Sequence, residues 1–279
     1  MSPTVVAMCG AGIAVFVIGM LASRRQIAGA NGLDRIVALA NVCVAVPLAV
    51  FGALHLFGPR IVLPIVPPYM PGRMFWVYVV GCALIAASVS IAIRVGVRWS
   101  GLLFGIMMFL FVAMIHLPGA LRQPGRIIWM IVFREMCFGG AGWLLAGQVT
   151  AGKVGRALVT LALIVFGVEH FLHPTGMPGV PLAKQMPAWV PGRPLIGYVT
   201  GAALLAVAGS VLLSRNTRAV AACVGGWLLL LLLVIYAPVM ISALSDPQVG
   251  VQLEGVNYFA DTLLFTGAIL TLGSVSRRA

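Results

Sequence analysis

The sequence predicts an all-α polytopic membrane protein with about nine transmembrane helices. We expect two parallel-repeat four-helix bundles and one additional N-terminal helix. Three observations lead to this fold class. Of the 279 residues, 61% are hydrophobic and 9% are charged, whereas soluble domains contain about 25% charged residues. Nine apolar segments approach the roughly 20 residues that a helix needs to cross the hydrocarbon core. The third observation is that the two halves of the chain resemble each other.

The nine segments are taken in chain order. They cover residues 4–22, 36–57, 74–96, 99–116, 127–147, 156–173, 194–214, 219–242 and 257–274. The first segment has no positive charge before its apolar run and is followed by Arg24 and Arg25. Since a cleavable signal peptide has the opposite order, we expect a retained first span.

An internal repeat pairs positions in the two halves. The sequence PGRMFWVYVVGCALIAA from Pro71 aligns with PGRPLIGYVTGAALLAV from Pro191 at an offset of 120 residues. Similarly, FGALHLFGP aligns with FGVEHFLHP at an offset of 115, which pairs His55 with His170. Fixed offsets of this kind are typical of duplicated structural units.

The same repeat predicts the domain organisation. We expect an N-terminal helix and loop over residues 1–35, a first four-helix unit over 36–150 and a second over 151–279. Each unit has an even number of spans, so both should insert in the same orientation. An axis along the membrane normal would then relate them.

The positive charges indicate membrane topology. The chain has a formal net charge of +12, but its 18 Lys and Arg residues are scattered at the ends of apolar runs and form no basic stripe, so no nucleic-acid partner is expected. Alternate sides of the predicted membrane carry 11 and 6 of these residues, leaving aside Arg134. The positive-inside rule therefore predicts a cytoplasmic (inner) membrane protein with its N-terminus outside and its C-terminus in the cytoplasm.

Each four-helix unit resembles the DoxX family. The features are a histidine near the outer end of the first span, a proline-rich loop, a Tyr-x-x-Gly second span and an acidic residue opening the last span. The likeness covers residues 36–147 and 156–274. This chain departs from a single-unit member by duplication, and Tyr236 and Asp261 stand where the first unit has His116 and Glu135.

DoxX-like proteins are associated with membrane redox systems, including subunits resembling those of thiosulfate:quinone oxidoreductase. The resemblance therefore implies a redox-linked subunit of a membrane quinone-linked oxidoreductase, with a quinone as the candidate cofactor. The lipid bilayer and a membrane or extracytoplasmic redox partner are the implied partners.

Polar residues near one predicted surface are the candidate site. Histidine and carboxylate side chains can exchange protons with a quinone, so the proposed catalytic residues are His55, His170, Glu135 and Asp261. The proposed cofactor-binding residues are His116, Tyr236, Arg73, Arg193, Glu169 and His173. Adjacent helical residues point about 100° apart, so Arg134 is not expected to pair directly with Glu135.

Several alternatives stay open for these side chains. Glu169, His170 and His173 could bind a metal, satisfy one another and the loop backbone, or line a polar pocket. Arg73 and Arg193 could reach lipid phosphates, pair with an acid or clamp an anionic ligand. The two functional alternatives are a proton-coupled small-molecule transporter and a structural or assembly subunit. Against transport, no predicted span contains a clear unwound region.

The loops over residues 58–73 and 173–193 each contain five prolines. This density predicts restricted loops without regular helix, which could form a lid over a lipid-accessible pocket. The glycines at 139–142 and 225–226 indicate close helix packing, since no phosphate-loop motif accompanies them. The five cysteines occur singly in apolar segments and are interpreted as core residues.

Overall fold

Helices account for the regular secondary structure of the protein. The computed structural model describes residues 1–276, in which one isolated β-bridge, between Gly176 and Gln185, is the only extended pairing. Within this part of the chain, nine helical segments are long and apolar enough to cross a membrane. The predicted all-α polytopic membrane fold is therefore confirmed. Arg277 and Arg278, which enter the charge count, lie outside the described residues.

The elements follow the predicted segments. Those up to the end of the first half are α1 (Pro3–Gly29), α2 (Asp34–Val37), α3 (Ala40–Phe57), α4 (Pro59–Val62), the 3-10 helix η1 (Leu63–Ile65), α5 (Arg73–Ile93), α6 (Val97–Phe111), the π-helix η2 (Val112–His116), α7 (Leu117–Arg122) and α8 (Arg126–Ala146). The second half contains α9 (Val149–Leu172), α10 (Arg193–Leu212), α11 (Thr217–Leu231), the π-helix η3 (Leu232–Tyr236), α12 (Ala237–Leu244) and α13 (Val249–Val275).

The first proline-rich loop differs from its prediction. The prediction that proline density excludes helix is wrong for residues 59–65, which form α4 and η1. Pro59 occupies the first position of α4, and Pro64 also lies near the start of its helix. A proline is tolerated there because the first amides of a helix have no intrahelical acceptor. The loop after α9, in contrast, contains no helix.

Spans four and eight each contain a π-helix that the sequence analysis did not predict. The Leu117 amide bonds to the Val112 carbonyl, five residues back. A proline follows at position 118, where its ring would clash with the carbonyl of residue 114 in a regular α-helix. The wider turn accommodates this proline, and the Met114 carbonyl accepts a hydrogen bond from the Tyr69 hydroxyl at 3.4 Å. The second π-helix, η3, lies 120 residues later.

Backbone geometry repeats at the offset found in the sequence. Gly72 and Gly192 precede α5 and α10 with φ angles of 61° each. Gly96 and Asn216 precede α6 and α11 with φ angles of 69° and 53°. Positive φ at four points separated pairwise by 120 residues supports a duplication. The division into domains remains a prediction.

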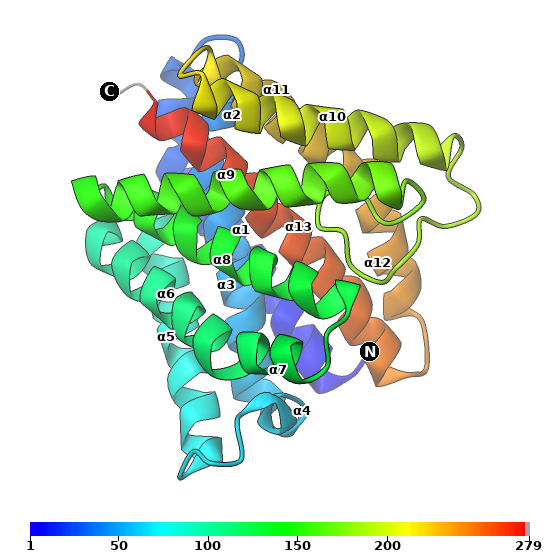
Figure 1. The fold of residues 1–279 in the computed structure, drawn as a ribbon. Coiled ribbons are helices and arrows are strands. Elements are labelled where there is room, and N and C mark those ends of the chain that lie inside the picture. Colours follow the sequence, from blue (N-terminus) through cyan, green and yellow to red (C-terminus); the bar gives the residue numbers. More distant parts are fainter. Residues whose placement is uncertain (277–279) are drawn as a thin grey trace.

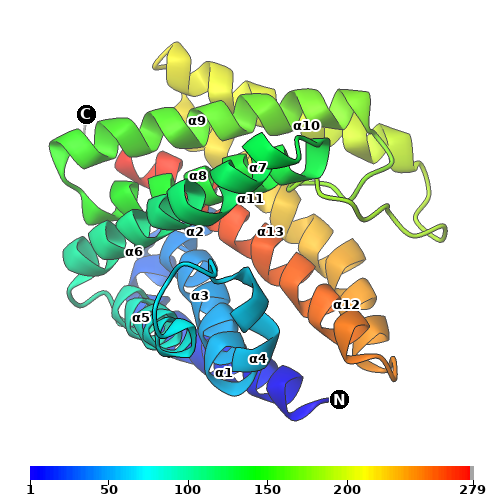
Figure 2. The ribbon, with the colours of Figure 1, turned by 60° about the horizontal axis from the view of Figure 1, so that its bottom comes forward.

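The last helix of each half packs against the first helix of the other half. Thus α8 contacts α9, and α13 contacts α3. Within the halves, α3 packs on α5 and α9 packs on α10, while α1 adds a layer against α3. In Figures 1 and 2, the start of α1 and the end of α13 lie on opposite sides of the molecule.

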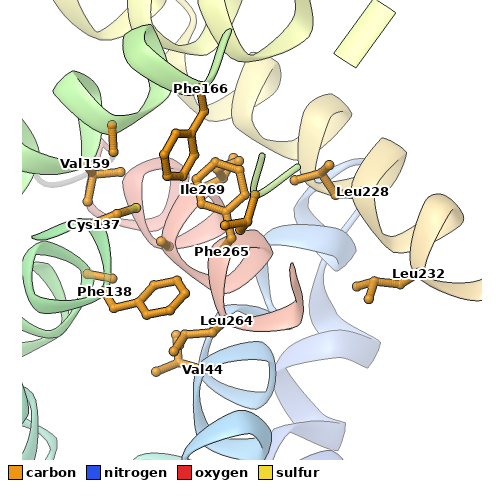
Figure 3. Close-up of a cluster of buried hydrophobic side chains, with 14 of the residues drawn as sticks. Val44, Cys137, Phe138, Val159, Phe166, Leu228, Leu232, Leu264, Phe265 and Ile269 are labelled. Atoms are coloured by element: carbon orange, nitrogen blue, oxygen red, sulfur yellow. The ribbon is translucent and has the colours of Figure 1, made fainter. Parts of the chain in front are cut away.

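A shared apolar core fills the junction of the halves. Figure 3 shows Val44 of α3, Phe138 of α8, Phe166 of α9 and Phe265 of α13 around this junction, and all four are buried. The aromatic rings of Phe166 and Phe265 have centroids 5.5 Å apart. Such contacts between distant parts of the chain hold the two halves in one body.

Candidate functional site

A cavity of about 890 Å³ lies in the first half of the protein. Side chains of α3, α5, α6, η2, α8 and α13 line it, together with the segment over residues 61–70 and Leu182 from the loop after α9. Most of the lining is apolar, as illustrated by Leu48, Val80, Met107 and Phe138. A volume of this size is within the range of small-molecule sites, about 300–1,000 Å³.

The cavity opens toward the side of the helix bundle. Three of its lining residues, Ile65, Val79 and Leu110, are 54%, 38% and 50% exposed. Val79 and Leu110 belong to spans three and four, α5 and α6. The cavity lining therefore reaches the exposed surface of two helices that are long and apolar enough to cross a membrane.

Arg134 joins the acidic residues of the two halves at the cavity wall. Its Nη2 atom lies 2.7 Å from Glu135 Oε1, and its Nη1 atom lies 2.8 Å from Asp261 Oδ2. The expectation that Arg134 and Glu135 do not pair directly is therefore wrong. The long arginine side chain bends back toward its neighbour, and Nε also lies 3.2 Å from Glu135 Oε1.

This cluster carries an excess of negative charge. Two carboxylates and one guanidinium sum to a charge of −1 when all three groups are ionised, and their side chains are 10%, 10% and 17% exposed. An unbalanced charge among apolar helices is costly. Uptake of one proton would neutralise the cluster. The cluster of Glu135, Arg134 and Asp261 therefore places one uncompensated carboxylate charge beside the cavity.

The two acids lie well inside their helices. Glu135 and Asp261 follow the starts of α8 and α13 by nine and twelve residues. At about 1.5 Å per residue, these positions are about 14 and 18 Å along the helix axes. The sequence analysis placed an acid at the opening of the last span, whereas the structure places both acids nearer the middle.

His55 and His170 make the same local hydrogen bond. The Nδ1 atom of His55 lies 2.7 Å from the Phe51 carbonyl oxygen, and that of His170 lies 2.6 Å from the Phe166 carbonyl oxygen. A carbonyl can only accept, so Nδ1 carries the proton and Nε2 of the neutral ring is an acceptor. The shared FG-x-x-H pattern thus fixes both imidazoles in one way.

The two histidines differ at Nε2. In His170, Nε2 accepts a hydrogen bond from the Gly179 amide at 2.9 Å, and the residue is buried. His55 instead lines the cavity, and within residues 1–276 no hydrogen bond reaches its Nε2 atom. Only the first of the paired histidines therefore has a ring nitrogen available to a ligand.

The aligned residues His116 and Tyr236 also differ. His116 lines the cavity at the end of η2. Tyr236 is buried at the end of η3, where its hydroxyl donates to the Pro178 carbonyl oxygen at 2.6 Å. Of the ten candidate site residues, the structure brings His55, His116, Glu135 and Asp261 together around one cavity.

The two arginines predicted to bind a cofactor, Arg73 and Arg193, instead bind backbone carbonyl groups of the loops that precede them. Arg73 donates to the carbonyl oxygens of Leu63 and Val66 at 2.7 and 3.0 Å. Arg193 donates to the carbonyl oxygen of Met186 at 3.3 Å. Neither arginine lines the cavity or forms an ion pair within the described chain. The carbonyl contacts, which sequence reasoning did not consider, fix each loop to the following helix.

Glu169 and His173 form a separate polar group. Glu169 pairs with Arg126 at 3.0 Å and lies 3.8 Å from His173 Nε2. Neither Glu169 nor His173 lines the cavity. Among the described residues, no group of three or more His, Cys, Asp and Glu side chains could hold a metal ion.

Three polar residues of α13 line the cavity but were not among the predicted site residues. They are Glu254, Asn257 and Tyr258. Lys184 pairs with Glu254 at 2.7 Å, and its amide donates to the Tyr258 hydroxyl at 2.9 Å. The predicted ninth span began only at residue 257. Residues 254, 258 and 261 recur at helical spacing on one face, which is the signal that could have identified them.

Comparison of the chain with protein-family models, with curated proteins and with solved structures finds no match.

Proposed function

We propose that this protein binds a lipophilic molecule with a hydrogen-bonding head group in the first-half cavity, and that this molecule is a quinone of a membrane redox system. The observation that carries the proposal is the combination within one cavity of an apolar lining, the free Nε2 atom of His55 and the Arg134 cluster. The redox assignment within this proposal comes from the resemblance of each half to the DoxX family.

The residues fit the chemistry of a quinone. The apolar lining suits the ring, and the opening beside α5 and α6 lets an isoprenoid tail remain among lipids. A bound quinone would supply two-electron, two-proton chemistry. The protein would supply proton carriers at the head group: His55 Nε2 would accept a proton from the quinol form, and Glu135 and Asp261 would exchange protons through their shared excess charge. Redox partners at the outer face of a cytoplasmic membrane belong to the same proposal.

Retention of lipids by the purified protein tests this function. We expect mass spectrometry of the detergent-purified protein to detect a retained quinone. The substitution Ala83→Trp should abolish retention because Ala83 lines the cavity. Ala86→Trp is the matched control, since Ala86 is exposed on the same helix and lies outside the cavity lining. Equal retention by both variants, or no retention by the parent, would contradict quinone binding in this cavity.

A second candidate function is proton-coupled transport of a small molecule. The supporting observation is that π-helices interrupt spans four and eight at equivalent positions, one of them beside the cavity. Interrupted spans and buried acids both occur in transporters. Uptake by proteoliposomes that depends on a proton gradient would favour transport over the quinone-linked function.

A further inference from the structure

The second half of the protein fills the space that forms the cavity in the first half. Six apolar or histidine residues of the cavity lining are Leu48, Phe51, His55, Leu84, Met108 and Ile115. Their equivalents at offsets of 115 and 120 are Leu163, Phe166, His170, Leu204, Leu228 and Ile235, and each is at most 1% exposed. The contrast lies at Phe51, His55 and Ile115, which are only partly buried, since Leu48, Leu84 and Met108 are buried as well. The segment between α9 and α10 supplies Met177, Val180 and Met186 to the same core.

A longer loop provides this filling. Residues 173–192 separate α9 from α10, whereas the shorter segment over 58–72 separates α3 from α5. The amide of Met177 donates to the Lys184 carbonyl oxygen, and that of Met186 donates to the Thr175 carbonyl oxygen, both at 2.9 Å. These bonds close a hairpin over residues 175–186, which we call the plug.

The tip of the plug presents one peptide group to both polar residues of the filled site. The Pro178 carbonyl oxygen accepts from the Tyr236 hydroxyl at 2.6 Å. The next amide, that of Gly179, donates to His170 Nε2 at 2.9 Å. Gly179 has a φ of 110°, and an added Cβ would lie 3.3 Å from Thr262. Glycine therefore lets the backbone itself approach the histidine.

We infer that the first-half cavity selects a lipophilic molecule with an aromatic hydroxyl, such as a quinol, over the corresponding oxidised quinone. The hydroxyl would do what the Pro178–Gly179 peptide does in the second half: donate to the histidine acceptor and accept from the residue on the π-helix. His55 and His116 stand at those two positions. This inference rests on the proposed function and assigns the form of the ligand that binds best.

The fixed orientation of His55 is the reason for the selectivity. The Phe51 carbonyl holds the ring proton on Nδ1, so Nε2 remains as the acceptor of a side chain that lines the cavity. A hydroxyl can donate to this atom. A quinone carbonyl or an ether oxygen would place two acceptors against each other, and both would remain unsatisfied in an apolar cavity. The discrimination thus depends on a hydrogen-bond donor and not on ring shape.

Three probes with the same decyl tail test the inference: a benzoquinol, the corresponding benzoquinone and the bis-methyl ether of the quinol. Binding to the purified protein would be measured by anaerobic equilibrium dialysis in detergent. We expect the quinol to bind at least about tenfold more tightly than either other probe, the scale of one lost hydrogen bond. In His55→Ala and in His55→Phe, which keeps an aromatic ring, this preference should disappear.

Phe57→Ala is the control variant because Phe57 is 65% exposed on the same helix, and it should keep the preference. Equal binding of the three probes to the parent protein would overturn the inferred preference for a hydroxyl group while leaving quinone binding intact. Preference for the quinol that survives both His55 substitutions would overturn the role of this residue. Failure of every probe to bind would overturn the inference and the proposed function together.

Discussion

Arg134 makes the two halves electrostatically dependent on each other. Each half contributes one acid at equivalent positions, Glu135 and Asp261, but only the first half contributes a guanidinium, because the position equivalent to Arg134 is Ala260. One arginine therefore serves two carboxylates. Removal of one member of a buried ion pair is strongly destabilising because the remaining charge lacks compensation.

We expect Arg134→Leu to lower the free energy of unfolding by about 3–5 kcal/mol. Thermal unfolding of the purified protein in detergent would measure this loss. Adding Asp261→Asn to Arg134→Leu should recover part of it, because one uncompensated carboxylate is removed. Arg126→Leu is a comparison variant, as its ion pair with Glu169 includes a more exposed arginine. Equal losses in Arg134→Leu and Arg126→Leu would contradict a special role for the central cluster.

The sequence predicted which residues are equivalent but not which of them meet. The repeat paired His55 with His170 and Glu135 with Asp261. It could not indicate that Asp261 reaches the cavity of the other half, because this depends on how α13 packs against α8. Helix geometry alone could not predict the contact of Arg134 with Glu135 either. Adjacent positions point about 100° apart, but the arginine side chain is long enough to bend back to its neighbour.

At the scale of elements, glycines set the closest helix crossings. A Cβ added to Gly140 of α8 would lie 2.8 Å from the carbonyl oxygen of Gly155 in α9. The two backbones therefore touch directly, in the way that small residues allow between membrane helices. The interpretation of residues 139–142 as a packing motif agrees with this contact. Because α8 and α9 belong to different halves, the crossing also fixes one half against the other.

Two substitutions on α9 separate packing from helix propensity. Gly155→Leu should destabilise the protein by about 3 kcal/mol or more, above the usual cost of an oversized core side chain, because the neighbouring backbone cannot move aside. Gly152→Leu should cost nothing or stabilise by up to about 1 kcal/mol, since no atom lies within 4 Å of a Cβ at this position. Melting temperatures in one detergent would compare them. Similar values for the two variants would argue against the close crossing.

Helix existence was predictable, whereas local irregularities were not. All nine spans were identified because length and hydrophobicity decide membrane insertion. Polar residues such as Lys153 and Glu254 concealed the first turns of α9 and α13. The π-helices before Pro118 and Pro238 depend on how the chain adjusts to a proline, which hydrophobicity does not reveal.

At the scale of the whole molecule, the charge distribution predicts one orientation. A green fluorescent protein fused to the C-terminus should fluoresce, because this fusion folds in the cytoplasm and fails to do so after export. A fusion to the N-terminus should remain dark for the same reason. Protease accessibility in spheroplasts would give an independent readout. Fluorescence of the N-terminal fusion and none from the C-terminal fusion would show that the predicted topology is inverted. The end of the cavity assigned to the outer face would then lie on the cytoplasmic side.

The two predicted repeats use equivalent space in different ways. In the second half, the plug completes a buried core around His170 and Tyr236. In the first half, the shorter segment leaves a cavity beside His55 and His116. The sequence already indicated this difference. The repeat offset is 115 residues before the loop and 120 after it, so the loop of the second half is five residues longer. Its consequence required the structure, since loop length alone does not indicate whether the added residues point inward.

The packing of α13 against α3 also has a consequence for biosynthesis. Asp261, Tyr258 and Leu264 complete the cavity wall from a helix that is synthesised after all the other described helices. Until then, Arg134 lacks one of its two carboxylates, and Val44 lacks the close contact with Gly267. The earlier spans are therefore in the membrane before their contacts with α13 can form. A chain that stops before α13 would therefore leave Arg134 without its Asp261 partner and the cavity without one of its walls.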